Sequence, residues 1–332
     1  IKSAVKLYGN EDPTMGLVRA FEEQAAVKGH RSLVKEAGKF AEELGVSLNL
    51  SYPNPKLYDE EGKEVPKEKI KDKLKQRIRS QNVKKTRGER WQGKLLTSRW
   101  DDEDLNKQEC FTWMTTWQRA TTHTIAGMME LYEQMLPTKV YSCHKIGTTP
   151  ANDITCRLCG KGTESMAHVI AGCSALAQSK YLERHNAALK VLYFELLRDL
   201  KLVDEVPPWY SKIQPKPLYE SQDVQAFWDI PVYAEHNEVR ANRVDARIVN
   251  HREKTVSTIE MSCPWVENRG KKDEEKTLKY GPLRWELKAQ YKGYKVNQYN
   301  VIIDVLGGWS VDMERSLRML LGSRCREILR LM

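Results

Sequence analysis

Four residues with zinc-binding side chains lie close together in the middle of the chain. They follow the pattern C-x2-C-x8-H-x4-C and are Cys156, Cys159, His168 and Cys173. A tight turn inside a C-x2-C pair directs both thiolates to one ion, and Gly160 and Gly162 favour such a turn. Three sulfurs and one imidazole suit a closed, structural, tetrahedral Zn²⁺ site. Cys143 and His144 lie just upstream as alternative ligands.

Two acids and a lysine farther along the chain have the residue types of a metal-dependent nuclease. Asp245 is followed by fourteen residues and then Glu260, and Lys276 comes later in a helical segment, with Lys279 and Tyr280 beside it. Two carboxylates can hold one Mg²⁺, whose bound water attacks a phosphodiester, while a lysine stabilises the charge that develops. By spacing alone this constellation is weak, because charged proteins often contain such triplets by chance.

The excess of positive charge is confined to one segment. Residues 67–94 contain twelve basic and three acidic side chains, so they carry +9, which equals the net charge of the whole chain. Such a segment indicates a polyanionic partner or a solvated helix face. The side chains that we expect to contact nucleic acid here and in later segments are Lys84, Lys85, Arg87, Arg90, Arg184, His185, Arg240 and Arg243. A surface or buried structural role is the alternative for the last four.

Hydrophobic periodicity predicts the helices and strands that carry these candidate site residues. Residues 174–202 repeat apolar side chains at helical spacing, and 101–136 are also expected to be helical. The runs RVDARIVN and KTVSTIEMSC indicate two strands around a polar turn at His251–Lys254, with Asp245 in the first and Glu260 in the second. A helix interrupted at Gly281-Pro282, a third strand and a terminal helix or helix pair follow.

The domain organisation follows from these elements. We expect a helical and basic region, partly disordered, over 1–100, and a helical region with the zinc knuckle over 101–205. A proline-rich linker over 206–231 then leads to an α/β domain over 232–332. Seven cysteines, an odd number without the spacing of a disulfide framework, favour a reducing compartment. No apolar run approaches ~18 residues, and the first residue is Ile1, so we expect a non-membrane piece of a longer protein.

The combined motifs resemble the carboxyl-terminal region of site-specific non-LTR retrotransposon polyproteins. The resemblance covers about residues 100–332 and rests on the CCHC knuckle with Arg184-His185-Asn186 after it, the proline-rich segment, RVD, IEMSCPW and EEKTLKY. It implies a structural Zn²⁺ and an α+β multidomain fold that ends in a PD-(D/E)xK restriction-endonuclease-like domain. Asp245 and Glu260 then hold a catalytic Mg²⁺, Lys276 is the displaced catalytic lysine, and Tyr280 ends the K-x-x-K-Y pattern.

The resemblance also implies a role and partners. Such a protein, in the nucleus, binds target DNA and element RNA, works with the rest of its polyprotein, and nicks DNA to prime reverse transcription. Two features depart from the pattern: Val244 replaces the proline before Asp245, and the gap from Cys159 to His168 is one residue longer than expected. The only Asp-Asp pair, at 101–102, lies in a polar segment, so this chain is not expected to polymerise DNA.

Two other classes of function stay open at this stage. A non-catalytic nucleic-acid-binding module would keep the zinc and the basic segment and use the α/β domain only for docking. A domain from a decayed element would be purely structural, and its weak DNA affinity would not respond to removal of the basic segment.

Overall fold

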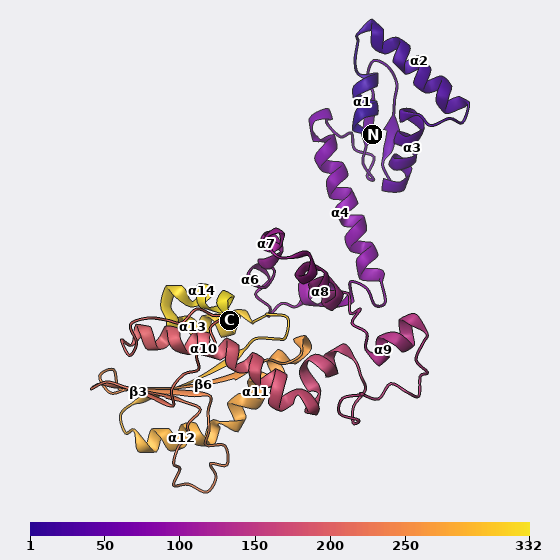
Figure 1. Ribbon diagram of the computed structural model, residues 1–332. Helices are drawn as coiled ribbons and strands as arrows, with labels where there is room; N and C mark the ends of the chain where they lie inside the picture. Colours follow the sequence, from indigo (N-terminus) through magenta and orange to yellow (C-terminus); the bar gives the residue numbers. More distant parts are fainter. The chain divides into compact units, whose positions relative to one another are not determined.

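The computed structural model describes all 332 residues, and the chain forms two compact units, Ile1–Lys94 and Leu95–Met332 (Figure 1). The fold is α+β. Along the chain, most helices come before or after the strands of one mixed sheet. None of the helices combines the length and apolar character needed to cross a membrane.

The first unit has a small core of its own. Its elements are α1 (Lys2–Tyr8), α2 (Pro13–Val27), α3 (Leu33–Leu44), the antiparallel strands β1 (Ser47–Asn49) and β2 (Lys56–Tyr58), and α4 (Ile70–Gly88). Side chains from α1, α3, β2 and the start of α4 build the core, among them Val5, Ala41, Leu57 and Ile70. Residues 1–100 were expected to be partly disordered; the structure instead folds this region, because these scattered apolar residues converge on one cluster.

Local signals fix where these helices begin and end. Asp12 caps α2 by accepting from the Thr14 N–H at 2.8 Å, and Pro13 occupies the first helical position. Ser32 caps α3 through the Lys35 N–H, and Gly45 ends that helix in the left-handed region at φ 65°. The first fifty residues thus form three helices with turns between them.

The second unit is organised around a five-stranded sheet of order β3-β4-β5-β6-β7. The strands are β3 (Leu218–Glu220), β4 (Val224–Trp228), β5 (Ala246–Asn250), β6 (Thr255–Ser262) and β7 (Lys295–Ile302). All neighbours are antiparallel except β6 and β7, which are parallel and are joined through helices. The hairpin of β5 and β6 around His251–Lys254 confirms the predicted strand pair.

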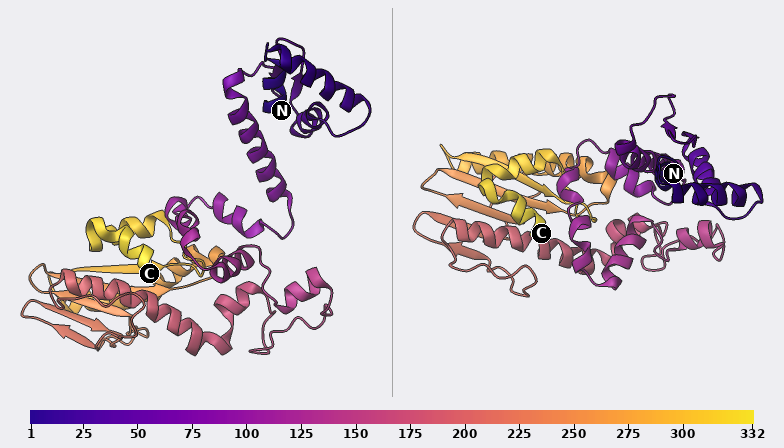
Figure 2. Two further views of the ribbon diagram at one scale, coloured as in Figure 1. Left: turned by 45° about the horizontal axis from the view of Figure 1, so that its top comes forward. Right: turned by 90° about the horizontal axis from the view of Figure 1, so that it is seen from above.

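Helices cover both faces of this sheet (Figures 1 and 2). One face packs against α10 (Leu182–Asp199), α13 (Val311–Leu321) and α14 (Cys325–Leu331) in the larger core, where Leu192, Ile259 and Leu317 are fully buried. The opposite face packs against α12 (Gly281–Gln290) and the end of α11 (Arg269–Lys279), in a second core that contains Val249, Val256, Leu283 and Leu287. The predicted break at Gly281-Pro282 separates these two helices.

The segment before the knuckle is attached to the sheet by buried charges. Its helices are α5 (Lys94–Asp101), α6 (Lys107–Cys110), α7 (Trp113–Thr116), α8 (Thr122–Tyr132) and α9 (Lys139–Tyr141). Arg99 of α5 and Arg269 of α11 each place Nη1 2.7 Å from Asp304 Oδ2, just after β7. Both arginines and the aspartate are buried, so this cluster fixes α5 against the sheet.

Three expectations about element boundaries differ from the structure. The continuous helix expected over 101–136 is divided into α6, α7 and α8, because Asn106 and Thr121 cap new helices inside it. The helix expected over 174–202 begins as an α-helix only at Leu182, because a π-helical turn, Ala177–Tyr181, precedes it. The linker expected over 206–231 contains β3 and β4, whose Val224 and Ala226 face the larger core, so no domain boundary separates 101–205 from 232–332.

Candidate functional site

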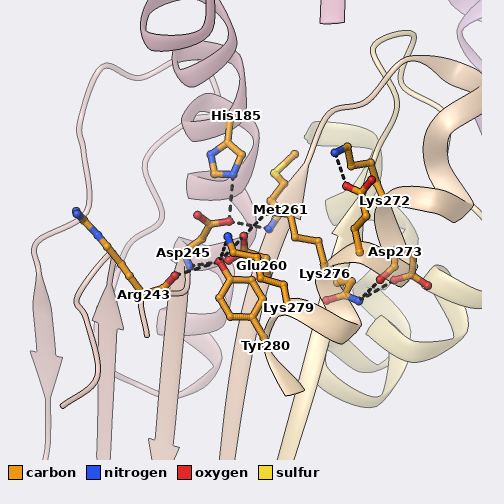
Figure 3. Close-up of polar contacts among 12 residues, drawn as sticks. His185, Arg243, Asp245, Glu260, Met261, Lys272, Asp273, Lys276, Lys279 and Tyr280 are labelled. Carbon is orange, nitrogen blue, oxygen red and sulfur yellow. Dashed lines mark hydrogen bonds and ion pairs between the residues drawn. The ribbon is translucent and has the colours of Figure 1, made fainter. Parts of the chain in front are cut away.

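The two acids of the candidate nuclease site lie opposite each other at one end of the hairpin. Ala246 pairs with Ile259 in the β5–β6 register, so the preceding residue, Asp245, lies across from Glu260. The Asp245 N–H donates to Glu260 Oε2 at 3.2 Å, and the Met261 N–H donates to Asp245 Oδ2 at 2.7 Å. The hairpin thus holds both carboxylates against the backbone of the neighbouring strand (Figure 3).

Helix α11 brings the expected lysine to these acids. Lys276 Nζ forms an ion pair with Glu260 Oε1. The Tyr280 hydroxyl, at the end of the same helix, lies 3.0 Å from Glu260 Oε1 and 3.1 Å from the Arg243 carbonyl oxygen, and Lys279 Nζ donates to it at 3.0 Å. The four sequence-predicted catalytic side chains, Asp245, Glu260, Lys276 and Tyr280, therefore come together in space (Figure 3).

Burial makes the charge on Glu260 depend on its neighbours. Only 4% of Glu260 is exposed, and this burial, with the nearby Asp245 charge, raises the pKa of its carboxyl, while Lys276 and Tyr280 act in the opposite direction. Burial and the Glu260 carboxylate also raise the pKa of Tyr280, which stays protonated. A cation beside the two carboxylates would favour the ionised form of both.

A histidine from the opposite face of the sheet completes this cluster. His185 of α10 places Nε2 3.1 Å from Asp245 Oδ2, and its Nδ1 lies 2.9 Å from Asn186 Oδ1. Burial opposes the positive charge on this imidazole, but the contacts with Asp245 and Asn186 outweigh it and raise the pKa of His185. Sequence analysis gave His185 either a nucleic-acid contact or a buried structural role; the structure directs it at the acid pair, in agreement with the second of these.

The acid pair offers the ligand type that Mg²⁺ prefers. Carboxylate oxygens are hard donors, and Mg²⁺ is commonly held by one or two carboxylates together with several waters. Asp245 Oδ1 takes part in no hydrogen bond, whereas Glu260 Oε1 is shared by Lys276 and Tyr280. The residues present thus fit a hydrated divalent ion at the Asp245 side of the cluster.

The Cys/His cluster brings four metal-binding side chains close enough together to hold one ion. Its ligand atoms, from Cys156, Cys159, His168 and Cys173, all lie within 4.8 Å of one another. The Sγ atoms of Cys156 and Cys173 are 3.9 Å apart, close to the ~3.8 Å expected for two sulfurs on one tetrahedral ion with Zn–S bonds of ~2.3 Å. Three sulfurs and one ring nitrogen therefore fit Zn²⁺, while Cys143 and His144 lie outside this set.

The loop between the ligands requires its glycines. Gly160 adopts φ 65°, a conformation that side chains disfavour. A Cβ on Gly162 would lie 2.7 Å from His168 Cε1, so only glycine lets this ring approach. The backbone N–H groups of Lys161 and Gly162 point at Cys159 and lower the pKa of its thiol to about 6, which favours the thiolate that a metal binds.

Tyr181, just before α10, and Arg184, in its first turn, hold the knuckle to this helix, and Arg184 also reaches the segment after β6. The Tyr181 hydroxyl accepts from the Cys173 N–H at 3.0 Å and lies 2.7 Å from the Val169 carbonyl oxygen. Arg184 donates to the carbonyls of Ile170 at 3.1 Å and Cys263 at 3.5 Å. Arg184 was expected to contact nucleic acid; its guanidinium is instead committed to backbone oxygens of the knuckle and of the segment after β6.

The remaining candidates for nucleic-acid contact are exposed but differ in their partners. Lys84, Lys85 and Arg87 lie on α4, and Arg90 follows that helix. Only Ile70 of α4 is buried, so the later turns present their charges to solvent. Arg240 is exposed without a side-chain hydrogen bond, whereas Arg243 is engaged by Asp229 through two contacts of 2.6 Å.

Comparison with known proteins adds no family assignment. No model of a protein family matches the chain, and no characterised protein matches it either. The reading of the site therefore depends on its geometry.

Proposed function

We propose that this chain is the DNA-binding, Mg²⁺-dependent endonuclease part of a non-LTR retrotransposon protein. The observation that carries the proposal is the convergence of Asp245, Glu260 and Lys276 at the end of one hairpin, with Lys276 paired to Glu260. This is the order in which a PD-(D/E)xK domain uses its residues: an acid, a second acid on the next strand, and a lysine. The mixed sheet with helices on both faces is consistent with a restriction-like fold.

The mechanism assigns a task to each side chain. A bound Mg²⁺ would supply an acidic water and neutralise charge on the scissile phosphate. Asp245 and Glu260 would hold that ion, while Lys276, released from Glu260, would stabilise the phosphate or orient the attacking water. Tyr280 supports Glu260, and His185 orients Asp245 through the bond to Oδ2. The product would be a nick whose 3′-hydroxyl can prime reverse transcription by the rest of the polyprotein, in the nucleus.

The zinc centre and the basic helix would supply binding. Zn²⁺ would fix the loop of residues 156–173 against α10, and a role of this knuckle in holding element RNA or target DNA is part of the proposal. The exposed basic residues of α4 would bind phosphates without sequence preference.

Plasmid nicking tests this function. The purified chain is incubated with supercoiled plasmid and Mg²⁺ beside Asp245→Ala. We expect open circles from the wild type only. Equal nicking by both would mean that a contaminant cuts the DNA.

A second candidate is a non-catalytic nucleic-acid-binding module. The exposed basic face of α4 favours it, because binding through α4 does not require the acid pair. This candidate predicts that the wild type and Asp245→Ala both shift DNA in a gel and that neither of them nicks it.

A further inference from the structure

A proline–proline–tryptophan–tyrosine sequence lies between α10 and β3. Residues 207–210 read PPWY, which is the P-P-x-Y pattern that one class of WW modules binds. With thirteen prolines and fourteen tyrosines in 332 residues, a chance occurrence of this pattern is roughly a one-in-fifty event. The nuclease proposal gives these residues no task.

The motif lies outside the helices and strands, so its proline pair is free to adopt the extended conformation that such modules read. No helix or strand occupies the segment between α10 and β3. Each proline fixes its own φ near −65°, which favours an extended polyproline conformation in Pro207 and Pro208. The Ser211 N–H donates to the Pro208 carbonyl at 2.8 Å, so Pro208–Ser211 form a turn with Trp209 and Tyr210 at its centre.

The side chains of the motif are displayed to solvent. Tyr210 is 72% exposed and Trp209 is 59% exposed, and their rings meet edge-to-face with centroids 5.5 Å apart. The Tyr210 hydroxyl takes part in no hydrogen bond, and neither ring belongs to the larger core. Two large exposed aromatic groups beside exposed Pro208 form an apolar surface that is available to a partner.

The exposed Pro207–Tyr210 segment is held to the rest of the protein on both sides. Val203 and Val206, before the prolines, pack against the larger core, and after the motif Lys190 Nζ donates to the Ser211 carbonyl oxygen. The segment is therefore held in place while its middle stays accessible, which reduces the entropy lost when a partner binds.

The charges beside the motif cancel. Asp204 and Glu205 precede the valine and the proline pair, and Lys212 and Lys216 follow the motif, all four exposed. This balance suits a proline groove, because such a groove recognises an apolar, extended backbone and needs no cation.

We propose that Pro207–Tyr210 is the docking site for a WW-type module of a partner protein. The proline pair enters the aromatic groove of that module and Tyr210 enters its neighbouring pocket, while Trp209 occupies the position at which the pattern accepts any residue. This interaction does not depend on the acid pair.

The test uses the full chain and an isolated WW domain of the class that reads P-P-x-Y, measured by titration calorimetry. The wild type is expected to bind one domain per chain. Tyr210→Ala and Pro208→Ala are expected to weaken binding by at least about tenfold. Trp209→Ala, and Tyr233→Ala at a tyrosine that is 82% exposed, should bind within about twofold of the wild type, inside the range of a near-neutral contact.

Two results would overturn the proposal. One is that the WW domain binds the wild type and Tyr210→Ala equally. The other is that the WW domain does not bind the wild type. If Tyr210→Ala then weakens the affinity for a single-stranded oligonucleotide, the aromatic pair stacks on bases. Because Tyr210 and Trp209 are exposed, all variants are expected to keep the thermal stability of the wild type.

Discussion

His185 Nε2 lies 3.1 Å from Asp245 Oδ2, although sixty residues separate the two in the sequence. One comes from the helix that follows the zinc knuckle and the other from the start of the acid-bearing hairpin. The contact therefore joins the part of the second unit that carries the Cys/His cluster to the candidate catalytic residues, at the end of the central strands of the sheet.

Replacing His185 is expected to slow nicking without weakening DNA binding. His185→Ala removes the group that fixes Asp245 Oδ2, and loss of a partner that orients a metal ligand typically costs about 10- to 100-fold in activity. Nicking rates and gel-shift affinities, measured on the same preparations, separate the two effects. His251→Ala, at an exposed histidine bonded to Tyr294, is the matched control. Unchanged nicking by His185→Ala would contradict the role given to this contact.

Zinc is expected to bind at one ion per chain and to stabilise the second unit. Cys156→Ser removes a ligand of the four-residue cluster, so it should lose the metal and melt several degrees lower, because structural zinc sites contribute folding free energy. Elemental analysis and thermal melting measure both quantities. Cys143→Ser, outside the cluster, should keep the ion and the melting temperature. Full zinc occupancy in the Cys156 variant would exclude the proposed ligand set.

The basic residues of α4 are expected to control the salt dependence of DNA binding. If Lys84 and Lys85 each neutralise one phosphate, the double change to glutamine lowers the slope of log K against log salt by about 2, since each contact contributes ~0.9. Affinities measured at several salt concentrations give the slope. The paired control is Lys28→Gln with Lys39→Gln, which removes the same charge elsewhere in the unit. Equal slopes in the two double variants would assign the effect to net charge alone.

Acid is expected to weaken the attachment of the loop that precedes Asp245. Glu286 of α12 is buried and accepts from His236, from Gln290 Nε2 at 2.7 Å and from the Glu235 N–H at 3.3 Å. These contacts, His236 first, lower the pKa of the Glu286 carboxyl to about 2. A lowered pKa stabilises the fold above the unfolded value of about 4.5, and this contribution is lost as the pH falls toward 2.

Urea unfolding of the wild type and of Glu286→Gln between pH 6 and pH 2.5 measures this effect. The difference in free energy of unfolding should be constant above about pH 5 and should shrink below it. Loss of zinc in acid affects both proteins alike and cancels in the difference. A difference that stays constant through this range would show that the pKa of Glu286 is the same in the folded and the unfolded protein, which contradicts the lowered value.

The elements that carry strong periodicity could be predicted from the sequence. The β5–β6 hairpin, the break at Gly281-Pro282 and the four-residue metal cluster follow from alternation, a helix-breaking pair and ligand spacing, all of which are local. The strands β3 and β4 were hidden in a proline-rich segment, because only three and five residues of it pair with neighbours.

The partners of Arg184 and His185 could not be predicted, because they depend on how α10 crosses the sheet. Two adjacent residues of one helix point to different destinations, the Ile170 and Cys263 carbonyls for one and the Asp245 carboxylate for the other. Sequence alone indicated only that an arginine and a histidine follow the knuckle. The available signal was the helical phase, which places His185 on the side of buried Leu189 and Leu192, one and two turns later.

The nicking rate of a matched set of isosteric variants tests the central claim most directly. Asp245→Asn, Glu260→Gln and Lys276→Met each remove one charge from the cluster, and Asp229→Asn removes a carboxylate of the nearby Arg243 ion pair as a control. With Mg²⁺ and supercoiled plasmid, the account predicts nicking by the wild type and the control, and at least a 100-fold loss in the other three, a range expected when charge stabilisation is removed. Nicking at the wild-type rate by Asp245→Asn and Glu260→Gln would contradict it.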